Sequence, residues 1–115
     1  MKIVIIGCNG QLGKCLQDKF INLDEQVIFI SRNELDISNI EDVNSKLVKE
    51  KPNFIVNAAA YTNVDQAEDD FDSAEEVNHA AVKNLSIIAG KIEAVLIHIS
   101  TDYVFDGSSK EPYTE

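Results

Sequence analysis

The segment that decides the fold is Gly7-Cys8-Asn9-Gly10-Gln11-Leu12-Gly13. An apolar run at residues 3–6 precedes it, and behind it Leu12, Leu16 and Phe20 recur at four-residue intervals. The run predicts a strand, and the spacing predicts a helix over about residues 10–22 with one buried stripe. Glycines permit a tight turn and close approach of a ligand to the backbone, while the start of a helix offers unpaired N–H groups to an anion. The segment therefore predicts a pyrophosphate-binding turn with its glycines, Gly7, Gly10 and Gly13, against the ligand.

Strand-like and helix-like segments go on alternating along the chain. Further apolar strand runs lie at residues 26–30, 54–56 and 94–99. Two more helices are predicted, with candidate capping boxes at residues 38–41 and 72–75, and with Pro52 and Gly90 near their ends. Their buried faces are expected to hold Ile40, Val43 and Leu47 in the first and Val77, Ala81, Leu85 and Ile88 in the second.

This alternation is typical of βαβ units around a parallel sheet. The predicted fold class is therefore α/β, a doubly wound parallel sheet of the Rossmann type with flanking helices. Right-handed crossovers and the usual winding predict about four strands in the order 3-2-1-4. Residues 1–115 would form one N-terminal NAD(P)-binding domain with an incomplete sheet. Its apolar fourth strand would be an exposed edge, which implies a continuation of the chain or a homo-oligomer.

Composition excludes several classes of partner. The 115 residues carry a formal net charge of −10 and a pI near 4.5, which argues against binding to nucleic acid or an anionic membrane. Cys8 and Cys15 lack the spacing of a metal or redox motif, so we expect two free thiols in a reducing compartment. No run approaches the ~20 apolar residues of a membrane span. We expect a cytoplasmic protein.

The residues that follow the predicted strands are candidates for cofactor contact. The second strand ends in Ser31-Arg32, at the place where an acidic residue would bind the ribose 2′-OH of NAD. A guanidinium suits a 2′-phosphate instead, so Arg32 favours NADPH over NADH, with a solvent-facing Arg32 as the alternative. After the third strand, the small residues 58–60 would let a ligand approach the backbone, or would pack against a helix.

Three strings give the chain a specific resemblance. Gly10-Gln11-Leu12-Gly13, Asn57-Ala58-Ala59-Ala60-Tyr61-Thr62 and Ser100-Thr101-Asp102-Tyr103-Val104-Phe105-Asp106-Gly107 resemble the dTDP-4-dehydrorhamnose reductases, which are extended short-chain dehydrogenases/reductases. The match covers essentially all 115 residues in order. The resemblance implies hydride transfer from the nicotinamide to the C4 carbonyl of a dTDP-linked 4-keto-6-deoxyhexose, giving dTDP-L-rhamnose. NADPH is the expected cofactor, with NADH left open.

The resemblance also implies roles for individual residues. Thr101 matches the catalytic hydroxyl that hydrogen-bonds the sugar carbonyl, and Asp102 matches a substrate-contacting position. Val64 is a further candidate for substrate contact. The matching cofactor positions are Gly10, Gln11, Leu12, Asp36, Ile37, Ala60, Tyr61 and Thr62. For Asp36, a purely local role in a turn is the alternative.

One catalytic pair of that family is missing from this sequence. The family's proton donor is a tyrosine with a lysine four residues on, where the ammonium lowers the pKa of the phenol. None of the three tyrosines, Tyr61, Tyr103 and Tyr113, is followed by a lysine at that distance. We therefore expect no turnover by this chain alone, even with NADPH and the sugar substrate.

Two other functions remain as alternatives. The chain also resembles the non-catalytic regulatory subunit of methionine adenosyltransferase, a nucleotide-binding module of the same fold, although Thr101 favours the enzyme. A sugar-nucleotide epimerase or dehydratase would share the glycine turn, but the string from Ser100 favours the reductase.

The remaining polar residues predict no catalytic or metal site. His98 is expected in the core or on a sheet face, and His79 on a helix facing solvent. The acidic run at residues 65–72 lacks the spacing and glycine of a calcium loop and is expected to be a solvated helix flank. The resemblance implies magnesium in full-length relatives, for dimerisation, but no metal ligand is assigned here.

Overall fold

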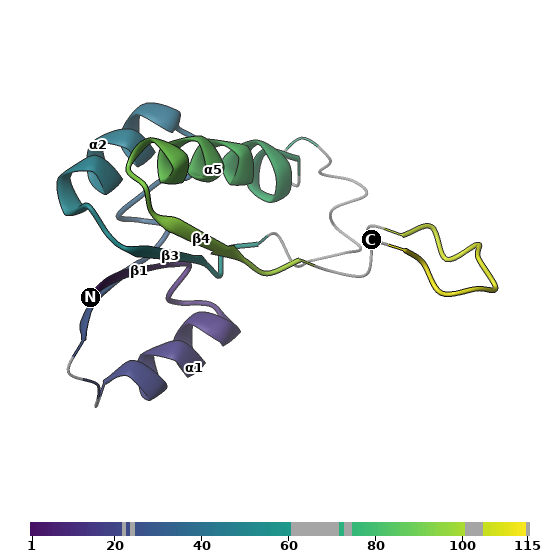
Figure 1. The fold of residues 1–115 in the computed structure, drawn as a ribbon, viewed down its shortest axis with the longest axis horizontal. Helices are drawn as coiled ribbons and strands as arrows, with labels where there is room; N and C mark the ends of the chain where they lie inside the picture. Colours follow the sequence, from purple (N-terminus) through teal and green to yellow (C-terminus); the bar gives the residue numbers. More distant parts are fainter. Residues whose placement is uncertain (22, 24, 61–71, 73–74, 101–104, 115) are drawn as a thin grey trace.

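The computed structural model is a four-stranded parallel sheet with helices on both faces (Figure 1). It describes residues 1–21, 23, 25–60, 72, 75–100 and 105–114. The elements are β1 (Lys2–Ile6), α1 (Gln11–Phe20), β2 (Gln26–Ile30), α2 (Ile40–Glu50), β3 (Phe54–Asn57), the π-helical turn η1 (Glu76–Ala80), α5 (Ala81–Lys91) and β4 (Val95–His98). The predicted α/β class is confirmed. None of the helices in the described ranges is long and apolar enough to cross a membrane.

The strand order is β2-β1-β3-β4, so the predicted order 3-2-1-4 was wrong. That order placed the third predicted strand, residues 54–56, outside β2, as a crossover continuing in the same direction would do. The chain instead passes from β2 through turns at residues 31–39 into α2, and β3 pairs with the other side of β1. A right-handed crossover that reverses direction places its helix on the opposite face of the sheet. Accordingly α1 lies on one face, and α2 with α5 on the other (Figure 1).

The core lies between the sheet and the pair α2 and α5, which we call the α2/α5 face. Leu47 of α2 and Leu85 of α5 are fully buried there against Ile55 of β3. The whole cluster comprises Val4, Ile6, Ile30, Leu35, Ile37, Val43, Leu47, Ile55, Ala81, Leu85, Ile88 and Ala89. The helical spacing predicted most of this face correctly. Two residues are exceptions. Ile40 begins α2 and is 41% exposed. Val77 lies in η1, is only half-buried and is not part of the cluster.

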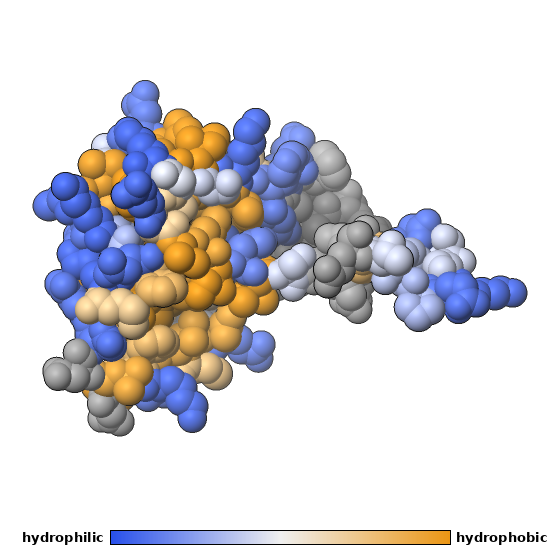
Figure 2. Space-filling model, in the orientation of Figure 1, coloured by the Kyte–Doolittle hydropathy of each residue, from blue (hydrophilic) through white to orange (hydrophobic). Residues whose placement is uncertain are grey.

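The opposite face, the α1 face, is covered by one helix in the described part of the chain. Leu96 of β4 packs towards the core, so its neighbours Val95 and Ile97 point to the α1 face. Both are exposed, as is Ile99 just beyond the strand. Hydrophobic side chains gather on the surface over β4 (Figure 2). The fourth strand therefore lies at an apolar sheet edge, as the sequence predicted.

The start of α2 differs from the predicted capping box. Asn39 is the N-cap, and its Oδ1 accepts hydrogen bonds from the backbone N–H groups of Glu41 and Asp42 at 3.0 and 3.4 Å. The hydroxyl of Ser38 donates to Asp36 at 2.7 Å. The prediction was wrong because Asp36 takes the serine hydroxyl and leaves the cap to the next residue. The second predicted box, at residues 72–75, includes residues outside those described.

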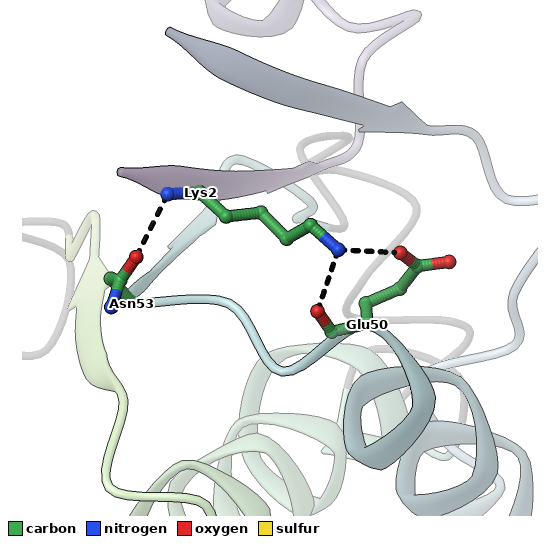
Figure 3. A network of polar contacts seen from close by, with 3 residues as sticks. All are labelled: Lys2, Glu50 and Asn53. Atoms are coloured by element: carbon green, nitrogen blue, oxygen red, sulfur yellow. Dashed lines mark hydrogen bonds and ion pairs between the residues drawn. The ribbon is translucent and has the colours of Figure 1, made fainter.

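Lys2 closes the amino-terminal end of the sheet (Figure 3). Its Nζ donates to the backbone carbonyl of Glu50 at 2.7 Å and lies 3.2 Å from the Glu50 carboxylate, at the last turn of α2. Its backbone N–H donates to Oδ1 of Asn53 at 2.8 Å, just before β3. These contacts tie β1, α2 and β3 together at one end. The carboxyl ends of the strands, at the other end of the sheet, are left to form a site.

Candidate functional site

A pocket of about 310 Å³ opens at the carboxyl ends of β1, β2 and β3. It lies where the winding of the sheet reverses, because β2 and β3 flank β1 on opposite sides. Ligands of open α/β sheets bind at such switch points. The lining residues are Ile6, Gly7, Asn9, Gly10, Arg32, Asn33, Leu35, Asp36, Ile37, Ser38, Ala58, Ala59, Ala60 and Val77.

The floor of the pocket is the glycine turn after β1. Gly7 has φ +82°, and a Cβ there would lie 2.6 Å from the backbone nitrogen of Ala59. Only glycine allows β1 and β3 to approach so closely at this point. Gly10 then begins α1 without a side-chain cap, and no acidic residue lies in the first turn of the helix. The N–H groups of that turn are therefore free to bind an anion, such as a pyrophosphate.

The rest of the turn serves packing. A Cβ on Gly13 would overlap the carbonyl oxygen of Gly7 and lie 2.6 Å from Cα of Cys8, so Gly13 brings α1 against the turn. Gln17 supports the same contact, since its Nε2 donates to the carbonyl of Cys8 at 2.7 Å. Cys8 is buried and Cys15 is exposed, and both are free.

Arg32 and Asp36 form the wall of the pocket beyond β2. The guanidinium of Arg32 is exposed and makes no ion pair with a carboxylate of the described residues. The hydroxyl and the backbone N–H of Ser38 both donate to Asp36, which holds the pKa of that carboxyl below its usual value. Ile37 is buried beside them. A cation without an ion-pair partner at the rim of the pocket is suited to a bound phosphate.

Asn57, at the end of β3, supports the side of the pocket that residues 58–60 form. The sequence analysis did not name it as a candidate. Its side chain is 1% exposed, and its Oδ1 accepts a hydrogen bond from the backbone N–H of Ala59 at 3.1 Å. Its Nδ2 faces Nδ1 of His98 on β4 at 3.2 Å. Because an amide nitrogen can only donate, His98 accepts with Nδ1 and carries its proton on Nε2. A polar residue ending a buried strand was the signal available in the sequence.

The pocket brings together six of the residues predicted from the sequence: Gly7, Gly10, Arg32, Asp36, Ile37 and Ala60. Three predicted contacts, Gln11, Leu12 and Gly13, do not line it. Five others lie outside the described residues, namely Tyr61, Thr62, Val64, Thr101 and Asp102. Ala58 and Ala59 line it as well, as predicted for the small residues after the third strand. The lining residues that were missed are mostly chain neighbours of predicted ones: Ile6, Asn9, Asn33, Leu35, Ser38 and Val77.

The two histidines occupy different surroundings. His98 is exposed on β4, as a sheet-face residue, and contacts Asn57. His79 lies in η1 with its side chain 69% exposed and pairs with the carboxylate of Glu75, one turn earlier. Most of the acidic run at residues 65–72 lies outside the described residues.

A parallel sheet wound in both directions, with a glycine turn at its switch point, defines the Rossmann-type class of α/β proteins. Residues 1–115 match the family described as the RmlD substrate binding domain, and the chain belongs to this family. Proteins named dTDP-4-dehydrorhamnose reductase are among its relatives, as the sequence resemblance indicated.

Three of these relatives define the extent of the match. The chain is 43% identical to the dTDP-4-dehydrorhamnose reductase of Aggregatibacter actinomycetemcomitans, over 99% of this chain and 39% of the relative. The crystal structure of the Clostridium acetobutylicum reductase superimposes with a TM-score of 0.93 at 44% identity, over 100% of this chain and 41% of that one. The Bacillus anthracis reductase, solved in complex with NADP, gives a TM-score of 0.86 at 38% identity. This match covers 96% of this chain and 39% of that one. The chain thus spans about two fifths of the length of these relatives.

Proposed function

We propose that this chain supplies the cofactor-binding half of an NADPH-dependent reductase that converts dTDP-4-dehydro-6-deoxy-L-mannose to dTDP-L-rhamnose. The observation that carries the proposal is the pocket, where the Gly7 turn, the uncapped start of α1 and the guanidinium of Arg32 converge. The names of the relatives and the NADP complex of one of them support it.

The described residues fit a dinucleotide of this kind. The pyrophosphate would lie against the first turn of α1, where Gly7 and Gly10 leave room for it. Arg32 would pair with the 2′-phosphate through its fork of donors. Ile37 would contact the adenine with its apolar side chain, and Asp36 would face the same end of the cofactor.

NADPH supplies the hydride that reduces the sugar C4 carbonyl. The Thr101 hydroxyl would donate a hydrogen bond to that carbonyl oxygen and stabilise the negative charge that develops on it. Asp102 and Val64 would contact the dTDP-sugar, while residues 60–62 would continue the cofactor wall. The proton for the product hydroxyl needs a separate acid, because this chain has no Tyr-x-x-x-Lys pair.

Cofactor binding by the chain tests the proposal. We expect NADPH to bind, and Arg32→Gln to weaken its binding by about ten- to a hundredfold, because a charge-assisted pair to the 2′-phosphate is lost. NADH binding should hardly change. Isothermal titration calorimetry of both cofactors measures this, with Lys49→Gln, in the last turn of α2 and outside the pocket, as the matched control. A wild-type chain that fails to bind NADPH, or equal effects of the two substitutions, would contradict the proposal.

A further inference from the structure

A carboxylate is held at the end of β2, although the sequence has none at that position. The backbone N–H and the hydroxyl of Ser31 both donate to Oε2 of Glu34, at 2.8 and 2.7 Å. The chain between them is closed by two backbone hydrogen bonds, because the N–H groups of Glu34 and Leu35 donate to the Ser31 carbonyl at 3.1 and 3.2 Å. The Glu34 carboxylate is therefore fixed beside the residue that directly follows the strand.

The second oxygen of this carboxylate is available to a ligand. Oε1 of Glu34 accepts no hydrogen bond from the described residues. The Ser31 N–H and then its hydroxyl hold the pKa of Glu34 below its usual value, so the group is charged at neutral pH. Its side chain is exposed and lines the hollow next to the pocket, not the pocket itself.

Glu34 and Arg32 line one hollow beside the pocket, and Arg32 lines both. The charged side chains around this hollow are those of Arg32, Glu34, Asp36, Asp42 and Lys46. Three carboxylates and two cations leave it with no excess of positive charge. A dianionic phosphate entering here meets the attraction of Arg32 and the repulsion of Glu34 together.

We propose that Glu34 determines the choice between the two nicotinamide cofactors. Its free Oε1 accepts the hydrogen bond of the adenosine ribose 2′-OH in NADH, and its charge opposes the 2′-phosphate of NADPH. In NAD-selective sites the acid that makes this contact ends the second strand. Here Ser31 occupies that position and holds the carboxylate of Glu34 there with two hydrogen bonds. The inference rests on the proposed cofactor site and assigns the choice between NADPH and NADH, which the sequence leaves open, to one residue.

Glu34→Gln tests this assignment, since it keeps the size of the side chain and an oxygen that can accept from Ser31. We measure the dissociation constants of NADPH and NADH with the 115-residue chain at low salt. The ratio Kd(NADH)/Kd(NADPH) should rise about three- to tenfold over wild type, the effect of one charge at contact distance from a phosphate. Ser31→Ala, which removes one of the two donors, should shift the ratio in the same direction by less.

Asp42→Asn is the matched control, because it removes a negative charge from the same hollow without a contact to Ser31. It should change the ratio less than about twofold, as expected for a more distant charge in solvent. Thermal unfolding of each variant shows whether it is folded.

Three results would overturn the assignment. If Glu34 only closes the turn, Glu34→Gln lowers the unfolding temperature and changes both affinities equally, so the ratio stays constant. If Asp42→Asn shifts the ratio as much as Glu34→Gln, the net charge of the hollow determines the choice of cofactor. If the wild-type chain binds neither cofactor, the proposed function fails together with this inference, whereas an unchanged ratio with both cofactors bound overturns the inference alone.

Discussion

The two faces of the sheet differ in how far helices cover the strands and how deeply side chains are buried. On the α2/α5 face two helices cover the strands, and side chains such as Val43, Leu47 and Leu85 have no exposed surface. On the α1 face a single helix of the described residues lies against the sheet, and Gly13 is the only buried residue of that helix. Val95 and Ile97 of β4 lie on the same face with about half of their surface in contact with water.

The difference shows which part of the sequence stabilises the fold. A buried aliphatic side chain contributes ~1.5–3 kcal/mol relative to an exposed one, so most of the hydrophobic stabilisation comes from the α2/α5 face. The pocket lies at the end of the sheet where residues from β1, β2 and β3 meet, and the closed face holds these three strands in place. The apolar surface over β4 contributes little to the stability of the isolated chain.

The largest expected effect comes from truncating equivalent side chains on the two faces. Leu85→Ala should lower the free energy of unfolding by about 3 kcal/mol, because it leaves a cavity in a closed core. Ile97→Ala, the matched change on the α1 face, should cost less than about 1 kcal/mol, since its side chain is already 43% exposed. Urea denaturation measures both. Equal costs would mean that β4 is covered in solution, and repeating the titration at two protein concentrations would reveal self-association.

An intermediate effect is expected at His98, which lies next to Ile97 on the same strand. His98→Leu removes the acceptor for the buried Asn57 amide and should cost about 1–2 kcal/mol. His98→Gln offers a side-chain oxygen to the same amide and should recover part of that loss. Chemical denaturation of the two variants compares them, and equal stabilities would show that the contact with Asn57 contributes nothing.

The smallest effect is expected from Asp36, at the polar rim of the α2/α5 face. Because two hydrogen bonds from Ser38 lower its pKa, the charged form stabilises the folded chain above the ordinary aspartate value of 3.8. This contribution is lost as the pH falls through the lowered value in the folded state. Asp36→Asn should therefore cost a few tenths of a kcal/mol at pH 7, as for other exposed groups, and progressively less as the pH falls below 3.8. Unfolding free energies measured across this range would contradict the assignment if the difference did not depend on pH.

Much of the fold followed from local patterns in the sequence. Val43, Leu47, Leu85 and Ile88 were predicted on buried faces from helical spacing, and these positions are buried in the core. The glycine turn was predicted between the first strand and the first helix, and Gly7 and Gly10 lie there, against the pocket. Such patterns are local because the period of a helix and the freedom of a glycine depend on a few neighbouring residues.

The predictions failed where the structure depended on contacts between residues distant in the sequence. They also failed where two groups competed for the same hydrogen-bond donor. The strand order depended on which side of β1 receives β3, and no periodicity records that choice. The cap of α2 depended on competition between Asp36 and the helix for the hydroxyl of Ser38. Asn57 was missed because its partner, His98, lies 41 residues further along the chain.

The sequence by itself thus determined the alternation of strands and helices, the glycine turn after the first strand and the family resemblance. Each of these is encoded in short stretches of neighbouring residues. The tertiary structure alone decided the reversal of the sheet at β1, which places the pocket between β1, β2 and β3. It also decided that the carboxylate of Glu34 lies at the end of β2, on Ser31. Both depend on hydrogen bonds that form only when the chain is folded, so the identity of the residues could not reveal them.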